Sequence, residues 1–481
     1  MLGRLNRDTS VFYYALHREA GLIKDDMLDG IDEVLDDPEL LELVSDTLGS
    51  ERPGSRKTGR ERIAADRVLR SLVLKHIKGF SLRELEREVR SNIVYRRFTH
   101  FDDDPVPRYS TFSRNFAALG PEVTKQIHGR IVVISIGDGT ARGRTLRTDT
   151  TAVDSNIHYP TDSSLLADGI RVLTRSLKRV AAECEQGAVN VVNHARASKL
   201  RVIEIHRAAK AMAYNKGEAA QGRLQKLYGK LTAMTCTVVN QGKKLVQEIE
   251  MGVLPVVGDA RRVLVQQAQL QHFLPLVEQV LKQTKARVFG GDNHYPNKLM
   301  SIFEEHSQLI RKGKPFKPNE FGRVVRIDEV ENGIISHYDV APDVPADQQQ
   351  WMPAVLQHKK TFGKAPKIAT ADRGYQSARN EREALEAGVG KVALPARGRL
   401  SEARGRFQKQ RWFKQAQRWR AGIEGRISTL KHRYGMGRAV YKGDYGFQRH
   451  VGWSVIANNL VNIARARQIK KGQQNAAAQA A

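Results

Sequence analysis

Three acidic residues are placed where they could act together in catalysis. Asp149 lies in TLRTDTTAV, Asp372 in KIATADRGY, and Glu424 in QRWRAGIEGRISTLKHRYG. The apolar patterns beside both aspartates predict strands that end near a carboxylate, and ligands bind at strand ends in α/β sheets. Carboxylates are preferred ligands of Mg²⁺, and a pair of such ions can activate an attacking oxygen and stabilise a leaving oxygen. The three acids could therefore support phosphodiester cleavage.

Basic residues accompany Glu424 along its predicted helix. Arg420 precedes it by four residues and Lys431 follows it by seven, so the three side chains form one stripe. The simplest interpretation is exposed pairing between neighbouring turns, worth about 0.2–0.5 kcal/mol per pair. We favour contact with DNA phosphates, because the densely basic stretch 397–420 leads into this stripe. The predicted DNA-binding residues are Arg373, Arg411, Arg418, Arg420 and Lys431.

The whole chain is strongly basic. Its 481 residues carry 79 Lys and Arg against 52 Asp and Glu, which gives a formal net charge of +27. Such an excess favours a polyanionic partner, and double-stranded DNA is the partner we expect. A merely soluble basic protein and a ribosome-associated protein are the alternatives. An anionic membrane surface fits less well, because the sequence shows no basic amphipathic anchor helix with an aromatic face.

Composition also bounds the class of protein and its compartment. Two cysteines, Cys184 and Cys236, are too few for a cysteine-based zinc site or a disulfide framework. A hydrophobic content of 41% is enough for a core. The sequence has no apolar run long enough to predict a membrane span, and MLGRLNRDTS lacks the apolar core of a signal peptide. We expect a cytoplasmic, nucleoid-associated protein.

The elements that must position the acids follow from the apolar periodicity. Residues 61–120 predict three short helices, with a capping box at Ser81 and Glu84 and a stop at Gly120. Lysines and arginines on their outer faces suit a DNA-binding or dimerisation module. A plain helical bundle is an equal alternative on this pattern.

Strand signals then alternate with a long helical stretch. IVVIS at 131–135 and TLRTDTTAV are typical of strands, residues 165–286 are almost wholly helical, and RVFGG at 287–291 again indicates a strand. FGRVVRIDEV and GIISHYDVA predict a hairpin around the turn residues ENG. Helices and strands alternate beyond it, ending in a helix over 412–434. The pattern predicts a mixed α/β domain interrupted by a helical insertion.

These patterns divide the chain into six parts. The predicted parts are an N-terminal helical segment and linker at 1–60, a helical DNA-binding or dimerisation domain at 61–130, an α/β catalytic domain at 131–164 and 287–440, a helical insertion at 165–286, a C-terminal helix at 441–467, and a disordered tail at 468–481. The two aspartates thus lie on either side of the insertion.

The motifs resemble those of the DDE transposases of bacterial insertion sequences, most closely the ISNCY-type group. The resemblance covers roughly residues 60–465. In that family the first acid lies in a motif similar to LRTDTTAVDSNIHYPTDSSLLADGIRVLTR, here 146–175, and the second in ADRGY, here 371–375. The segment FEEHSQLIRKGKPFKPNEFGRVVRIDEVENG also resembles the family, as the linker into the hairpin.

The third acid of the family lies in a helical Y-(2)-R-(3)-E-(6)-K pattern. Arg420, Glu424 and Lys431 match the last three positions of this pattern. Gln417 stands where the family has tyrosine, so the sequence departs from the pattern there. This departure concerns a contact to DNA and not the metal ligands.

The resemblance implies both a fold and an activity. It implies an RNase H-like fold in which Asp149, Asp372 and Glu424 hold Mg²⁺ or Mn²⁺, with two ions at the site. It also implies cleavage at the terminal inverted repeats of an element, attack of the freed 3′-OH ends on target DNA, and a homodimer in the DNA complex. A nuclease that cuts without joining and a DNA-binding protein without catalysis are the alternatives. The presence of all three acids argues against the second.

Other acidic residues could enter the site. Asp154 follows Asp149 by five residues and could be the first acid instead. Asp162 is expected to be a helix N-cap or a turn residue. Asp292 could support the site from outside, although a loop position fits it better.

Histidines and tryptophans near these motifs have structural interpretations as well. His158 and His294 lie in similar HYP contexts, and a structural hydrogen bond is expected for each in preference to metal ligation. Trp412 and Trp419 could stack on a splayed base. Packing in the core is the interpretation that we favour for both.

Overall fold

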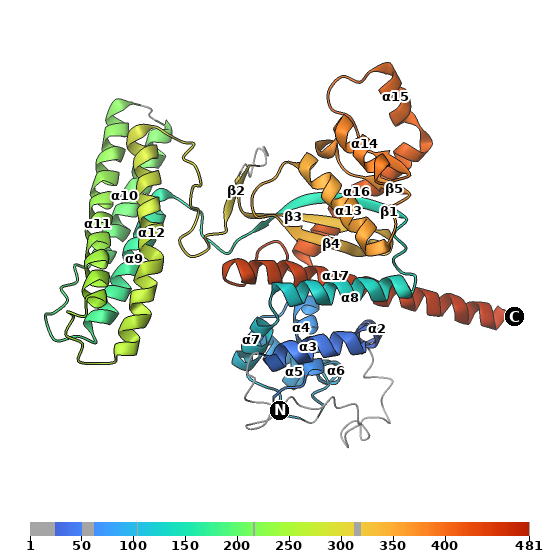
Figure 1. Cartoon of the computed structure of the whole chain (residues 1–481), viewed down its shortest axis with the longest axis horizontal. Helices are drawn as coiled ribbons and strands as arrows, with labels where there is room; N and C mark the ends of the chain where they lie inside the picture. The colour runs from blue at the N-terminus through green and yellow to red at the C-terminus, as the bar shows by residue number, and fades with distance from the viewer. Residues whose placement is uncertain (1–24, 51–61, 103, 215–216, 312–318, 481) are drawn as a thin grey trace. The chain divides into compact units, whose positions relative to one another are not determined.

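The computed structural model describes residues 25–50, 62–102, 104–214, 217–311 and 319–480. The chain divides into two compact units, one formed by Met1–Asn156 with Ile310–Ala481 and the other by Ile157–Leu309. Figure 1 shows helices along most of the described chain. The described strands form a six-stranded sheet. The linker predicted within 51–60 lies outside the described residues.

Seven helices precede the sheet in the described part of the first unit. They are α2 (Asp26–Leu35), α3 (Pro38–Ser50), α4 (Ala65–Lys78), α5 (Leu82–Ser91), α6 (Ile93–Phe98), α7 (Tyr109–Ala118) and α8 (Pro121–Gly137). The predicted capping box at the start of α5 is confirmed, because Ser81 and Glu84 satisfy each other's backbone N–H groups. The prediction of three helices over 61–120 missed the short helix α6.

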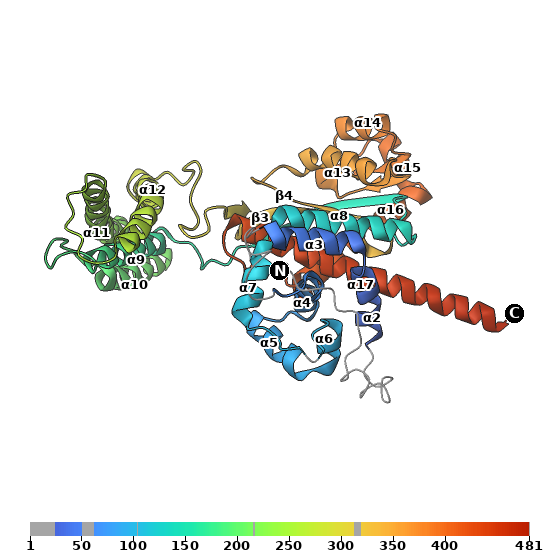
Figure 2. The same cartoon turned by 60° about the horizontal axis from the view of Figure 1, so that its bottom comes forward.

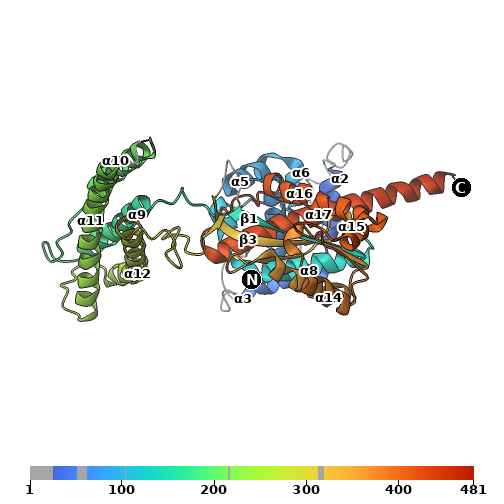
Figure 3. The same ribbon diagram turned by 90° about the horizontal axis from the view of Figure 1, so that it is seen from above.

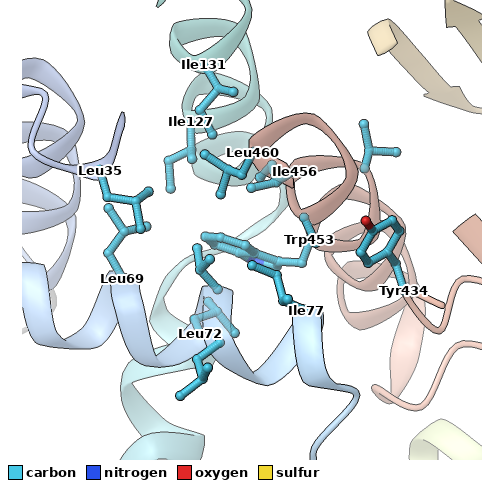
Figure 4. Packing of buried hydrophobic residues seen from close by; sticks show 14 of the residues in the cluster. Leu35, Leu69, Leu72, Ile77, Ile127, Ile131, Tyr434, Trp453, Ile456 and Leu460 are labelled. Atoms are coloured by element: carbon cyan, nitrogen blue, oxygen red, sulfur yellow. The ribbon is translucent and has the colours of Figure 1, made fainter. Parts of the chain in front are cut away.

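The helix α8 corrects a prediction. IVVIS belongs to α8 and not to a strand. Ile127 and Ile131, one turn apart, are both fully buried, and they lie beside Leu460 and Ile456 of α17 (Gly443–Ala480) in the hydrophobic core (Figure 4). Tertiary packing of this apolar stripe outweighs the local β preference of its branched residues.

The last helix completes the same core. Trp453 of α17 is fully buried and lies near Leu69, Leu72 and Ile77 of α4 (Figure 4). Contrary to the prediction of a disordered tail from residue 468, α17 continues to Ala480. Its final residues are rich in Ala and Gln, which have high helix propensity.

The sheet is mixed. Its strands are β1 (Thr145–Asp154), β2 (Gln308–Arg311), β3 (Asn319–Glu329), β4 (Ile335–Val340), β5 (Ile368–Thr370) and β6 (Lys391–Ala393). They follow the order β2-β3-β1-β5-β6, and β4 also pairs with β3. β1 runs antiparallel to β3, beside which it lies in Figure 3, and parallel to β5, which is in turn parallel to β6. The predicted mixed α/β class is confirmed.

The predicted hairpin is also confirmed. β3 and β4 are antiparallel and joined by the turn Glu331–Gly333, where Asn332 has a φ of 56° and Gly333 a φ of 73°. Asparagine and glycine tolerate this left-handed backbone better than other residues do. The residue types of the turn therefore account for its position in the chain.

Helices cover both faces of the sheet (Figure 2). Leu146 of β1 packs in one cluster with Trp351 of α13 (Asp347–Phe362), whereas the neighbouring Arg147 donates to the Trp419 carbonyl of α16 (Arg411–His432). Successive residues of a strand point to opposite faces, so α13 and α16 lie on opposite faces. Between them along the chain are α14 (Ala378–Glu386) and α15 (Glu402–Lys409).

The second unit is helical, as predicted for most of it. Its helices α9 (Asp162–Ala181), α10 (Ala195–Tyr214), α11 (Glu218–Glu250) and α12 (Ala260–Gly290) lie alongside one another (Figure 1). RVFGG, predicted as a strand, ends α12 instead. Asp162 does not cap α9, because Thr161 does, and the buried Asp162 carboxylate forms an ion pair with the partly exposed Arg287.

Candidate active site

Sheet register brings the two aspartates to the same edge of neighbouring strands. Arg147 of β1 pairs with Thr370 of β5, and this is the last pair between these parallel strands. Asp149 and Asp372 each lie two residues beyond it. The carboxyl end of a parallel pair is where ligands bind in α/β sheets.

Asp149 lies in a strongly acidic environment. The pKa of its carboxyl is raised to about 6, chiefly by burial and in part by the negative charges of Asp372 and Asp347. The Thr150 backbone N–H, which donates to Asp149 Oδ1 at 2.8 Å, and the Arg420 guanidinium act in the opposite direction on this pKa. The site therefore combines several carboxylates with two arginines, Arg420 acting on Asp149 and Arg397 acting on Asp347.

Asp347 is a member of this group that the sequence analysis missed. Thr150 Oγ1 donates to Asp347 Oδ1 at 2.9 Å. The other oxygen, Oδ2, faces Asp372: a β-carbon added to Gly374 would lie 2.6 Å from Asp347 Oδ2 and 2.7 Å from Asp372 Oδ1. An acid in the first turn of a helix is common because it complements the helix dipole, so the position of Asp347 does not single it out. We call Asp149, Asp347 and Asp372 the acidic trio.

Glycine is required at position 374 by these two oxygens. Gly374 is buried, and its N–H donates to Asp372 Oδ1 at 2.6 Å. Any larger residue would place its β-carbon well inside contact distance of two carboxylates. Within ADRGY, Asp372 thus supplies a carboxylate that can bind a metal ion, and Gly374, two residues later, leaves space next to that carboxylate.

Three attachments fix α16 across the sheet. Gln417 Nε2 donates to Thr370 Oγ1 at 2.9 Å and to the Ala393 carbonyl at 2.7 Å, at the ends of β5 and β6. The Trp419 carbonyl accepts from Arg147. Further along the helix, Arg426 Nε lies 3.3 Å from Glu329 Oε1. The turns between residues 417 and 426 are therefore held on the sheet at both ends.

Arg147 and Glu329 form the buried part of this attachment. They are direct cross-strand partners on β1 and β3. The guanidinium donates in bidentate fashion, from Nε to Oε2 at 2.9 Å and from Nη2 to Oε1 at 2.6 Å. The Trp419 ring also lies 4.7 Å from the Arg147 guanidinium carbon.

Glu424 lies next to the acidic trio but does not point into it. Arg420 Nη2 donates to Glu424 Oε1 at 3.3 Å, as the four-residue spacing predicts. The Arg420 side chain is 19% exposed and close enough to lower the pKa of Asp149, whereas the Glu424 side chain is 70% exposed. The structure therefore brings Asp149 and Asp372 together and leaves Glu424 one helical turn beyond Arg420.

The other predicted DNA-binding residues lie near Asp372 or Glu424 in the sequence. Arg373, Arg411 and Arg418 are exposed, and Lys431 is half-buried. The tryptophans are half-buried and packed against protein: Trp412 contacts Phe407 and Phe413, and Trp419 contacts Arg147. The expectation of core packing is therefore met only in part: Trp412 packs at the edge of a hydrophobic cluster, whereas Trp419 lies over the Arg147 guanidinium.

The weaker acidic candidates do not join the acidic trio. Asp154 ends β1 opposite Gly322, and its backbone N–H donates to the Gly437 carbonyl at 3.1 Å. Asp292 is exposed and accepts from the His294 backbone N–H at 2.7 Å, as a loop residue. His158 is exposed and lies 3.6 Å from Asp168.

The donor set of the acidic trio suits a hard divalent cation. Carboxylate oxygens of Asp347 and Asp372 face each other with no side chain between them at Gly374, and the Asp149 charge adds to theirs. Ca²⁺, Mg²⁺ and Mn²⁺ prefer such oxygens. Among the residues that the structure describes, no three His, Cys, Asp or Glu side chains already converge closely enough to hold a metal ion.

Two protein families match the chain. A transposase domain (DUF772) matches residues 17–118, and a transposase DDE domain matches residues 392–464. Both matches support a DDE transposase of an insertion sequence. No curated protein and no solved structure matches it.

The two matched ranges lie toward opposite ends of the chain. The first covers most of the N-terminal helices, and the second contains Glu424 and ends within α17. Asp149 and Asp372 lie outside both ranges, so their assignment rests on the resemblance of motifs and on the sheet register. Within the described residues, no helix is apolar over a length that would cross a membrane.

Proposed function

We propose that this transposase cleaves DNA at the terminal inverted repeats of its element and joins the freed 3′-OH ends to target DNA, with Asp149, Asp372 and Glu424 as its catalytic acids. The observation that carries the proposal is the convergence of Asp149 and Asp372 beyond the last pair of β1 and β5, beside the α16 stripe that carries Glu424. We further assign the ISNCY-type group on the motifs quoted above.

The sheet supports an RNase H-like catalytic domain. Strands β4, β3 and β1 are successively antiparallel, and β1, β5 and β6 are successively parallel. The helical unit Ile157–Leu309 separates β1 from most of the sheet in the sequence. We interpret this unit as an insertion into the catalytic domain, because the two segments on either side of it form one sheet.

The side chains divide the work of binding and chemistry. Asp149 and Asp372 hold one edge of the site and Glu424 the other, while Gln417, Arg147 and Arg426 keep α16 in place. Bound Mg²⁺ or Mn²⁺, two ions in this proposal, would activate the attacking oxygen, first of water and then of the 3′-OH, and stabilise the leaving oxygen. In this structure the charge of Arg420 compensates that of Asp149. Metal ions bound to the acids would take over this role and would leave Arg420 available for a DNA phosphate.

Basic residues position the DNA in this proposal. Arg373, Arg411 and Arg418 are exposed cations near the site in the chain, and with Arg420 and Lys431 they would contact phosphates. We propose a homodimer in the DNA complex, since two element ends must be joined to one target, and a nucleoid-associated, cytoplasmic location.

Single alanine substitutions of the three acids test the proposal. Asp149→Ala, Asp372→Ala and Glu424→Ala should each abolish cleavage of a duplex carrying the terminal repeats that flank the gene, with DNA binding largely retained. Glu402→Ala is a matched control, because Glu402 is an exposed acid on the neighbouring helix α15. Wild-type cleavage by all three variants would show that the acids are wrongly assigned.

Strand transfer needs its own assay. A pre-cleaved end with a free 3′-OH, supplied with a target plasmid, should give joined product with the wild-type chain and none with Asp372→Ala. Cleavage without joining would favour an RNase H-like nuclease. DNA binding with neither reaction would favour a catalytically inactive DNA-binding protein.

A further inference from the structure

Two carboxylate oxygens face each other across Gly374, and the Arg397 guanidinium lies beside the same space. They are Asp347 Oδ2 and Asp372 Oδ1, which lie 2.6 Å and 2.7 Å from the point that a β-carbon of residue 374 would occupy. Neighbouring carboxylates of this kind repel each other unless a proton or a cation compensates them. The missing side chain at 374 leaves space for such a cation.

The position of Asp347 is fixed rather than accidental. Thr150 Oγ1, on the strand that carries Asp149, donates to Asp347 Oδ1 at 2.9 Å. This bond leaves Oδ2 as the oxygen that faces Asp372. The backbone of Asp347 begins α13, whose residue Trp351 is fully buried against β1 and β5, so the helix cannot shift without opening the core.

A buried hydroxyl lies beside the same acids. Tyr375 is fully buried, and its hydroxyl makes no hydrogen bond of normal geometry. Burial raises the pKa of Tyr375, the charges of Asp149, Asp347 and Asp328 raise it further, and Thr150 lowers it, so the hydroxyl interacts electrostatically with the same acids. An unsatisfied buried hydroxyl is costly unless water or a ligand's hydration shell completes it.

We propose that Asp347 is a fourth acidic residue of the active site and shares a divalent cation with Asp372 and Asp149. Its carboxylate reaches the site from α13, on the face of the sheet opposite to α16, so the cation is held from both faces. This inference rests on the proposed function and adds to it, since none of the family motifs quoted above includes Asp347. Glu424 then completes the site from α16 when DNA is bound.

Metal binding to the full-length protein tests the assignment without DNA. Mn²⁺ affinity is measured by electron paramagnetic resonance of the free ion, and the rise in thermal midpoint on adding Mg²⁺ gives a second readout. Asp347→Asn should weaken Mn²⁺ binding by about 10–100-fold and reduce the Mg²⁺-dependent rise, because a direct ligand matters at least as much as a group that supports one. Asp343→Asn, an exposed acid in the same segment, has the same charge change and should bind Mn²⁺ as the wild type does.

Two further variants make the outcomes distinguishable. Gly374→Ala places a methyl group between the carboxylates and should also weaken Mn²⁺ binding while every acid is retained. Asp372→Asn serves as the reference for the proposed function. Normal Mn²⁺ binding by Asp347→Asn together with weak binding by Asp372→Asn would overturn the role of Asp347 alone. Normal binding by Asp372→Asn would instead overturn the proposed metal site itself.

Discussion

Gln417 of α16 donates a hydrogen bond to the hydroxyl of Thr370, 2.9 Å away, at the last residue of β5. The same amide nitrogen donates to the Ala393 carbonyl at the end of β6. Gln417 also begins the helix stripe that continues through Arg420 to Glu424. One side chain thus ties the helix of the third acid to the strand that leads to the second.

Loss of the hydrogen bonds of Gln417 should impair catalysis more than stability. Gln417→Leu removes the three donated bonds, so α16 can shift relative to β5. We expect a cleavage rate about 100-fold lower, because a displacement of about 1 Å in a catalytic group has an effect of this size. Gln415→Leu, at an exposed position of the same helix, is the control and should leave the rate unchanged. Equal rates for Gln417→Leu and wild type would contradict the positioning role.

The buried pair of Arg147 and Glu329 should dominate the local stability. Arg147→Met leaves the fully buried Glu329 without its bidentate partner. We expect the free energy of unfolding to fall by about 3–5 kcal/mol, which thermal and urea unfolding would measure. The double variant Arg147→Met, Glu329→Leu should recover part of this loss, because the fully buried carboxylate is removed as well. Arg426, which also contacts Glu329, is partly exposed and keeps its hydrogen bond to Asn458. Arg144→Met, at an exposed position just before β1, should have little effect; a similar loss there would point to a cause other than the ion pair.

DNA affinity should depend steeply on salt. Each phosphate contact releases counterions, so the logarithm of affinity falls with the logarithm of salt concentration by about 0.9 per contact. Arg411→Ala and Arg418→Ala should each weaken binding and lower the magnitude of this slope by about 0.9, the value for one phosphate contact. Fluorescence anisotropy with a labelled duplex would measure both quantities. Lys470→Ala removes an exposed cation far along α17 and serves as the control. An unchanged slope in both arginine variants would remove these residues from the DNA interface.

Buried neutral histidines should make the first unit sensitive to acid. Burial lowers the pKa of His128 to about 4 and that of His450 to about 4. The folded state therefore takes up a proton less readily than the unfolded state, whose histidines titrate near 6.5, so this contribution to stability is complete above that pH and is lost as pH falls toward 4. The expected loss is about 1.4 kcal/mol per pH unit for each histidine in that range.

His128→Gln isolates one of these groups. Nε2 of the neutral ring donates to the Ile335 carbonyl at 2.9 Å, and a glutamine amide can donate there without titrating. The thermal midpoint of this variant should fall less between pH 7 and pH 5 than that of wild type. His432→Gln, at an exposed position, should follow the wild-type curve. Parallel curves for all three proteins would show that His128 does not contribute.

Local patterns predicted the elements that position the site more readily than they predicted the site itself. The hairpin β3–β4, the strand before Asp372 and the helix of Glu424 follow from alternation, turn residues and helical spacing. The first strand was predicted to end near Asp149, but β1 runs through Asp149 to Asp154. The prediction of a strand at IVVIS was wrong because branched residues suit both a strand and the buried stripe of a helix. Only the packing of α8 on α17 decides between the two. The prediction of a disordered tail from residue 468 was wrong because the low-complexity composition was taken for disorder, although Ala and Gln favour helices.

Asp347 shows the limit of prediction for the site. Its neighbours in the chain carry no ligand pattern, and its role depends on Thr150 and Gly374, which are distant in sequence. Glu424 shows the reverse. The pairing with Arg420 that its spacing predicted is present, whereas the exposure of its side chain does not follow from the sequence. Contacts across the sheet are set by register and helix packing, which a single sequence does not specify.

The place of α17 in the core has a consequence for synthesis of the protein on the ribosome. Leu69, Ile127 and their neighbours can be covered only after residues 453–460 have been translated and have left the exit tunnel. The segment Ile157–Leu309 is continuous and made before that point. The middle of the nascent chain can thus fold while its beginning still exposes an apolar surface, and we expect chaperones that bind such surfaces to govern the yield of active protein.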